Sequence, residues 1–258
     1  MHILENKDLI VESKKAGAEL VRIYSKKYNK EILWNGDEKF WARRSPVLFP
    51  IVGKLKENKT LIEDKIFSMN QHGFARDMNF EIINTTDNSI TYKLTSSEET
   101  KEVYPYDFNL FITYTINNEK INVKWKIENI DNKEIYFSIG AHPAFNISSS
   151  KNLKDYYLEF EKEETANRYP LLNGRTIGKP VPCLMQTKRI PLHSEMFANG
   201  AWNFKGLSSQ RVCLASEKNQ HKIIIDFPGF SHFSIWSVPN ASYICIEPCN
   251  GIAASEEE

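Results

Sequence analysis

Alternation of apolar and polar residues with a period of two runs through much of the chain. In the segment SITYKL it places Ile90, Tyr92 and Leu94 on one face. Such alternation is typical of a β-strand with one face against a core, because successive side chains point to opposite faces. The segments NLFITYTI and INVKWKIENI alternate in the same way and are joined by the polar residues NNEK. This arrangement predicts a β-hairpin.

Further strands are predicted at both ends of the chain. RVCLAS and HKIIIDF predict a second hairpin, and LIVESKKAGAELVRIYSKKYNKEILW predicts three early strands with turns at Lys15–Gly17 and Tyr28–Asn29. Helical periodicity is scarce, and its best candidate is the short segment HSEMFAN with Ser194 as the N-cap. Many short strands with few helices predict an all-β fold, an antiparallel β-sandwich or barrel. Since no repeat or linker marks a boundary, we expect residues 1–258 to form one domain.

The composition is that of a soluble globular protein, with 41% apolar and 26% charged residues. Its 33 basic and 33 acidic residues balance, and no long basic run occurs, so neither nucleic acid nor an anionic membrane is an expected partner. No apolar stretch approaches the roughly 18 residues that span a bilayer. The N-terminal segment is too highly charged for a signal peptide. We therefore expect a cytoplasmic protein.

Metal binding and several common catalytic motifs are not indicated. The four cysteines, at positions 183, 213, 245 and 249, are expected to be reduced in the cytoplasm. Cys245 and Cys249 lack a second pair, and no two histidines have tight ligand spacing, so we do not expect a metal site. The chain also lacks the G-x-S-x-G, H-E-x-x-H and glycine-rich phosphate-loop motifs.

Three stretches combine a titratable side chain with the end of a strand. In NQHGFARDMNF a glycine follows His72, and in SIGAHPAF a proline follows His142. In SYICIEPCNG, Glu247 ends an apolar run, where a carboxylate is costly unless it is paired or open to a cleft. Taken singly, each histidine is more simply a turn residue or a hydrogen-bonded core residue. Taken together, two histidines and one glutamate resemble an acid–base set.

These stretches belong to a longer pattern of six motifs in fixed order: SPVLFPIVGKL (45–55), QHGFARD (71–77), YPYDF (104–108), ENIDN (128–132), SIGAHPAF (138–145) and YICIEP (243–248). Through these motifs, which extend over nearly the whole chain, the sequence resembles the aldose 1-epimerase (galactose mutarotase-like) superfamily, particularly its LacX-like branch. The resemblance implies a large antiparallel β-sandwich, the galactose mutarotase-like supersandwich, with an open sugar cleft. It also implies interconversion of the α and β anomers of an aldose without a metal or an organic cofactor.

The resemblance also implies roles for the three titratable residues. His142 resembles the general acid, Glu247 the general base, and His72 the second histidine, which holds and polarises the sugar ring oxygen. Mutarotation removes the proton of the C1 hydroxyl while the ring oxygen receives one, which opens the C1–O5 bond before the ring recloses. Imidazole titrates near neutral pH and suits this donation. An ionised Glu247 is expected to raise the pKa of a nearby histidine and keep it charged.

Further residues are candidates for contact with the sugar: Arg44, Lys54, Arg76, Phe145 and Trp236. The cations suit sugar hydroxyls or a phosphate, and the rings suit the apolar face of a sugar. Solvated surface charges and core packing remain the alternatives. Related sequences often carry an acidic residue in the stretch that matches MFANGAWNF, where this chain has Gly200 at the expected position. The identity of the sugar therefore stays open.

Three functions remain open at this point. The leading one is a mutarotase that acts on a hexose or a hexose phosphate, the latter with Arg44, Lys54 and Arg76 as a cationic clamp. The second is a non-catalytic carbohydrate-binding module on the same fold, which would not require the acid–base set. A glycosidase would require a second carboxylate, such as Asp226, near Glu247. The expected partner is a small sugar, and the protein is expected to be a monomer or a homodimer.

Overall fold

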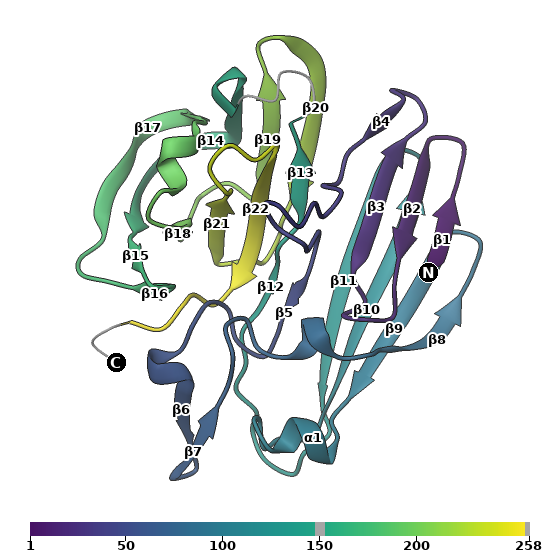
Figure 1. Cartoon of the computed structure of the whole chain (residues 1–258), viewed down its shortest axis with the longest axis vertical. Coiled ribbons are helices and arrows are strands. Elements are labelled where there is room, and N and C mark those ends of the chain that lie inside the picture. The colour runs from purple at the N-terminus through teal and green to yellow at the C-terminus, as the bar shows by residue number, and fades with distance from the viewer. Residues whose placement is uncertain (148–152, 256–258) are drawn as a thin grey trace.

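The structure, a computed structural model, describes residues 1–147 and 153–255. In these residues the chain forms antiparallel sheets and only short helical segments (Figure 1). This confirms the all-β class and the scarcity of helices. No helix in the described ranges is long and apolar enough to cross a bilayer.

The first sheet follows the order of the chain, with the strands β1 (His2–Glu5), β2 (Leu9–Ser13), β3 (Leu20–Ser25) and β4 (Lys30–Glu31). Strands β2 to β4 are the three predicted early strands. Strand β1 was not predicted.

The second sheet has the order β11-β10-β9-β8 and packs against the first (Figure 1). Its strands are β8 (Glu81–Thr85), β9 (Ser89–Thr95), β10 (Phe108–Asn117) and β11 (Lys120–Asn129). Ile90, Tyr92 and Leu94 are buried in the first hydrophobic core, between the two sheets, as their spacing predicted. Strands β10 and β11 form the predicted hairpin, with Ile112 opposite Trp125.

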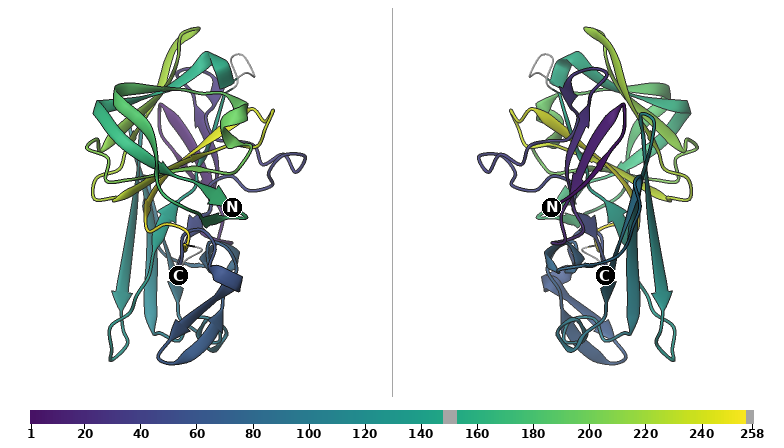
Figure 2. Two further views of the ribbon diagram at one scale, coloured as in Figure 1. Left: turned by 90° about the vertical axis from the view of Figure 1, so that its left-hand side faces the viewer. Right: turned by 90° about the vertical axis from the view of Figure 1, so that its right-hand side faces the viewer.

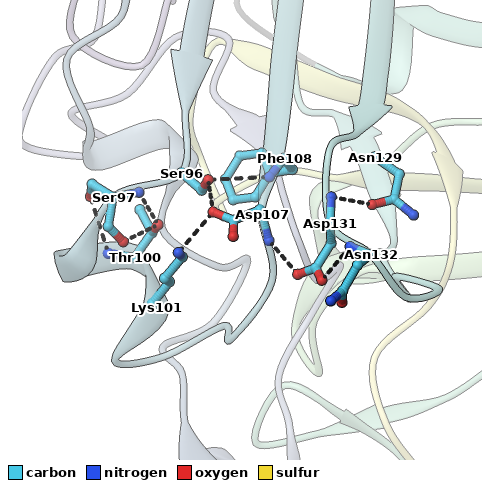
Figure 3. A network of polar contacts seen from close by, with 9 residues as sticks. All are labelled: Ser96, Ser97, Thr100, Lys101, Asp107, Phe108, Asn129, Asp131 and Asn132. Atoms are coloured by element: carbon cyan, nitrogen blue, oxygen red, sulfur yellow. Dashed lines mark hydrogen bonds and ion pairs between the residues drawn. The ribbon is translucent and has the colours of Figure 1, made fainter.

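The motifs YPYDF and ENIDN meet at one end of the second sheet (Figure 3). Asp107 accepts hydrogen bonds from Ser96 Oγ and Lys101 Nζ, both at 2.9 Å, and its backbone N–H donates to Asp131 Oδ2 at 2.8 Å. The short helix α1 (Glu98–Lys101) begins beside them with a capping box formed by Ser97. Two of the six motifs therefore brace the sheet at this end.

The third sheet has ten strands and carries the second hydrophobic core. Its strands are β5 (Val47–Leu48), β12 (Ile139–Ala141), β13 (Ala144–Asn146), β14 (Tyr156–Tyr169), β17 (Val181–Pro191), β18 (Trp202–Lys205), β19 (Arg211–Ser216), β20 (Asn219–Asp226), β21 (His232–Trp236) and β22 (Tyr243–Asn250). The main path runs β20-β19-β14-β18-β21-β22-β12-β5. Strands β19 and β20 are the second predicted hairpin.

The remaining elements are short. Strands β6 (Lys59–Ile62) and β7 (Lys65–Ser68) form one small hairpin, and β15 (Leu171–Leu172) and β16 (Arg175–Thr176) form another. The 3₁₀ segments are η1 (Lys56–Asn58), η2 (Ala75–Asp77), η3 (Leu153–Asp155) and η4 (Ser194–Phe197). The predicted helix in HSEMFAN is therefore only the 3₁₀ segment η4, and the prediction of Ser194 as its N-cap is wrong. His193 occupies that position without a side-chain hydrogen bond.

Candidate active site

His142 and Glu247 face each other across a break in the third sheet. Strands β12 and β13 both pair with β22, and the register is the same on both sides of the break, with Gly140 opposite Cys249 and Ala144 opposite Cys245. The same register carried through the break places His142 opposite Glu247. His142 Nε2 lies 3.5 Å from Glu247 Oε1. The structure therefore brings together the acid and the base suggested by the sequence.

Two further polar side chains continue this row across the sheet. Ser234 on β21 is the register partner of Glu247, and Asn203 on β18 is the partner of Ser234. Both are buried, and Ser234 Oγ donates to Asn203 Oδ1 at 2.6 Å. Sequence reasoning missed both residues. Each could have been noticed as a polar residue inside an apolar run, Ser234 in HFSIW and Asn203 in WNF.

The stretch with the missing acidic residue is now located. Gly200 precedes β18, and a Cβ added to it would face Leu171 rather than the polar row. The polar side chain that this stretch contributes to the row is Asn203.

His72 approaches the pair from the segment between β7 and η2. Its backbone is left-handed (φ 69°), and so is that of Gly73 (φ 71°), where a Cβ would lie 2.2 Å from the Phe49 carbonyl oxygen. The Gly53 N–H donates to His72 Nδ1 at 3.0 Å, so the neutral ring carries its proton on Nε2. The rings of His72 and His142 are 5.7 Å apart and nearly perpendicular.

Glu247 differs from the other two glutamates that are buried in the described ranges. Glu19 accepts two backbone N–H groups and pairs with Lys14, and Glu164 accepts two backbone N–H groups from Ser208 and Ser209. Glu247 Oε1 is buried without a hydrogen-bond partner among the described residues, and so is His142 Nδ1. Because buried polar atoms are normally satisfied, these two are the atoms most in need of a functional explanation.

Burial favours the neutral forms of this pair. It raises the pKa of Glu247 to about 8 and lowers the pKa of His142 to about 3, and the positive charges of Arg76 and Arg43 lower the pKa of His142 as well. Both directions run against the expectation of a charged histidine beside an ionised glutamate in the free protein, and they favour the form in which the proton of the pair lies on Glu247.

Three aromatic side chains border the pair. Trp41, from the segment between β4 and β5, stacks on His142 at 4.9 Å, and Trp236 meets His142 edge to face at 5.7 Å. Tyr243 lies beside both tryptophans. Trp236 was a candidate for sugar contact, and the structure places it at the pair. Trp41 was not recognised in the sequence.

Two arginines, Arg76 and Arg43, lie close enough to His72 and His142 for their charges to act on both histidines. Arg76 Nη2 donates to the Gln71 carbonyl at 2.7 Å, while Arg76 Nε is buried without a hydrogen-bond partner in the described ranges. Arg43 Nη2 donates to Asp77 Oδ1 at 2.7 Å. Both cations lower the pKa of His72, after burial and His142. The candidate Arg76 is therefore close to the acid–base set.

The other three candidates make no recorded contact with His142 or Glu247 among the described residues. Phe145 is buried in the second core, because the alternation of β13 turns it away from the face that carries Ala144 and His142. Arg44 Nε donates to the Asn35 carbonyl at 2.8 Å and closes the base of a loop. Lys54 lies against the turn between β15 and β16, with its Cδ 3.5 Å from a Cβ added at Gly174. The contacts of Phe145 and Arg44 do not support direct contact with the reacting atoms, whereas Lys54 follows Gly53, which bonds His72, and its role stays a prediction.

One group of donors has the composition of a metal site. Ligand atoms of His142, Cys245 and Glu247 lie within 4.8 Å of one another, and all three residues are buried. An imidazole, a thiol and a carboxylate suit a borderline-soft cation such as Zn²⁺. However, metal-bound histidines usually donate their second ring nitrogen to an acceptor, and His142 Nδ1 has no such partner among the described residues. The set lacks the support typical of a resident metal.

Comparison with known proteins gives consistent relatives. Residues 2–251 match the family described as Aldose 1-epimerase. The chain is 31% identical to "Protein LacX, chromosomal" of Lactococcus lactis subsp. lactis, over 99% of this chain and 89% of that protein. A galactose mutarotase related enzyme from Lactobacillus acidophilus has a TM-score of 0.90 at 30% identity, covering 100% of this chain and 87% of that one. A galactose mutarotase-like protein from Lactobacillus casei ATCC 334 has a TM-score of 0.90 at 28% identity, covering 99% and 91%.

The raised pKa of Glu247 predicts a pH-dependent gain in stability for Glu247→Gln. The folded wild type holds a proton that the unfolded chain loses above its ordinary carboxyl pKa, so wild-type stability falls as the pH rises towards 8. Glutamine does not titrate, so the stability of the variant does not fall with pH at this position. We expect the difference in free energy of unfolding to favour the variant by at most about 1.4 kcal/mol for each pH unit above the ordinary carboxyl pKa. Urea denaturation at pH 4.5, 6 and 7.5 measures it, and a pH-independent difference would contradict the buried neutral carboxyl.

Proposed function

The chain belongs to the aldose 1-epimerase family, and on that premise we propose that it interconverts the α and β anomers of a hexose by acid–base ring opening and closure. Membership of this family supports a sugar epimerase or mutarotase-like enzyme of the isomerase kind, with a sugar as substrate. The observation that carries the finer proposal is the unsatisfied Glu247 Oε1 opposite His142. A sugar C1 hydroxyl is a donor that would satisfy it.

The proton count of the pair fits both halves of the reaction. In ring opening, ionised Glu247 takes the C1 hydroxyl proton while protonated His142 donates to the ring oxygen. This leaves Glu247 protonated and His142 neutral. After the aldehyde turns, ring closure returns both protons to their starting groups. The free protein rests in the form left by ring opening, so the proton passes from Glu247 to His142 before a ring opens, at zero net charge throughout.

The neighbouring residues suit the binding of the sugar. The neutral His72 ring carries its proton on Nε2, 3.2 Å from the Gln71 amide nitrogen, and this N–H can donate to the ring oxygen beside His142 once it leaves that neighbour. Ser234 and Asn203 offer a hydroxyl and an amide, and these can donate to and accept from sugar hydroxyls. The Trp236 ring can stack on the apolar face of the sugar. These roles rest on the positions of the side chains relative to the acid–base pair.

A hexose phosphate is the second candidate substrate. Arg43 and Arg76 place two guanidinium groups near the histidines, while Asp77 is the one carboxylate among the described residues that pairs with them. This excess positive charge, with the unsatisfied Arg76 Nε, suits a phosphate.

The function is tested by following freshly dissolved α-D-galactose and α-D-glucose, and their 6-phosphates, by polarimetry. We expect the purified protein to accelerate anomerisation of at least one of them above the spontaneous rate. A preference for the phosphates would favour the second candidate. No acceleration with any of the four sugars would reject a mutarotase acting on these common hexoses and their 6-phosphates.

Glu247→Gln is expected to lower kcat for the preferred sugar by about 10²- to 10⁴-fold, because glutamine cannot accept the C1 proton. Glu164→Gln is the matched control, since Glu164 is equally buried but binds backbone N–H groups. Its activity per folded molecule should be unchanged. Full anomerisation by Glu247→Gln would reject the assignment. If the wild type bound a sugar but did not accelerate its anomerisation, the protein would instead be a binding module.

The pH profile of kcat/KM should fall on the alkaline side from about pH 8, by about tenfold for each pH unit. Above that pH the pair has lost its single proton and has none to give to the ring oxygen. Stopped-flow polarimetry between pH 5 and 10, corrected for spontaneous anomerisation, measures this limb. A limb near pH 6.5, the ordinary histidine value, would show that His142 titrates alone.

A further inference from the structure

Apart from an interaction with its own backbone, the His142 ring is surrounded by other rings rather than by hydrogen-bond partners. Its Nδ1 has no partner among the described residues, whereas Nδ1 of His72 is fixed by the Gly53 N–H. A functional histidine is commonly oriented by a hydrogen bond at its second nitrogen. The plane and tilt of the His142 imidazole must therefore be set by packing.

Trp41 makes the face-to-face contact. Its ring centroid is 4.9 Å from that of His142, with 30° between the planes. The other rings recorded against His142, those of Trp236 and His72, meet it nearly at right angles. Trp41 is itself held against Trp236 at 5.5 Å and Tyr243 at 5.9 Å. The indole therefore covers one face of the imidazole and is confined by its own neighbours.

The loop that carries Trp41 is braced to the rest of the protein. Figure 2 shows the segment between β4 and β5 standing out from the sheets. The Trp41 N–H donates to the Asp37 carbonyl, and the Trp34 indole N–H donates to the Trp41 carbonyl at 2.8 Å. At the base of the loop, Arg44 and Ser45 donate their backbone N–H groups to the buried Glu19. Trp41 is thus presented by a fixed loop.

We propose that Trp41 is a positioning residue for His142: its indole fixes the imidazole plane so that Nε2 faces Glu247, and its π face stabilises the imidazolium. The proposal rests on the proposed function. A cation over the face of a tryptophan is attracted by the ring quadrupole, and the attraction grows when water is excluded. The His142 imidazole is buried, so water is excluded from its contact with Trp41 and the attraction is of the stronger type.

The charges around His142 show why such support matters. Arg43, from the Trp41 loop, and Arg76, in η2, both oppose a positive charge on His142, as does burial. Cys245 and Tyr243 share its face of the sheet from β22, and burial raises the pKa of both, so they remain neutral. Neutral His72 adds no charge. Ionised Glu247, the His142 backbone and the Trp41 face are the groups that favour the imidazolium.

The test compares Trp41→Phe with Trp41→Leu, which differ chiefly in the π face. We expect Trp41→Phe to keep kcat within about threefold of the wild type and Trp41→Leu to lose about tenfold or more, with KM changed less than threefold. Trp125→Leu, on β11 and packed against Phe230, is the matched control for loss of a half-buried tryptophan. Its kcat should be unchanged. Equal kcat for the two Trp41 variants, both folded by circular dichroism, would overturn the proposal.

A second readout is independent of activity. Nitrogen-15 NMR of histidine side chains, assigned with His142→Gln, reports the tautomer and order of His142 at pH 7. We expect the wild type and Trp41→Phe to share one tautomer signature and Trp41→Leu to show a second one or exchange broadening. An unchanged signal in Trp41→Leu would overturn the positioning role. If no sugar is anomerised but the signal depends on Trp41, the function fails while the positioning stands.

Discussion

Glu247 loses its hydration when β22 is buried on both faces, and no described group replaces the hydrogen bonds of Oε1. A bare carboxylate in that position would be costly, and burial accordingly raises the pKa of Glu247 and lowers the pKa of His142, which favours the neutral forms of both. The pair then carries no net charge and a single mobile proton. An acid–base reaction that returns its protons each turnover suits such a pair, because the charge of the site does not change.

The pair exists because of strand register. Glu247, Ser234 and Asn203 are neighbours on three adjacent strands, and His142 completes the row where β12 stops and β13 has not begun. A slip of one residue in β22 would turn Glu247 into the second core and bring Ile246 to the site. The extensive pairing of the ten-stranded sheet is therefore what keeps the reactive groups on one face.

The segments that complete the site come from the N-terminal half of the chain. His72 is presented by a left-handed turn that Gly73 allows to pass close to Phe49. Trp41 and Arg43 come from a loop whose base is bound by Glu19, a buried carboxylate that is fully occupied. The buried glutamates of the described residues therefore have two different roles. Those satisfied by backbone N–H groups brace loops, and the unsatisfied one remains for the reaction.

The amino-acid pattern was enough to predict the all-β class, the two main hairpins and the family, and it pointed to His72, His142 and Glu247 as the candidate acid–base set. Alternation and short motifs involve residues that are close together in the chain, so they can be recognised without knowing how the chain packs. Tertiary structure alone decided that Phe145 faces the core, that Asn203 and Ser234 join the row, and that Trp41 lies on His142. Burial in the folded chain also shifts the pKa values of Glu247 and His142 against the expected protonation of the pair. Strand register, burial and the packing of loops against the sheet bring together residues that are far apart in the chain. No local sequence pattern predicts which of these residues will be in contact.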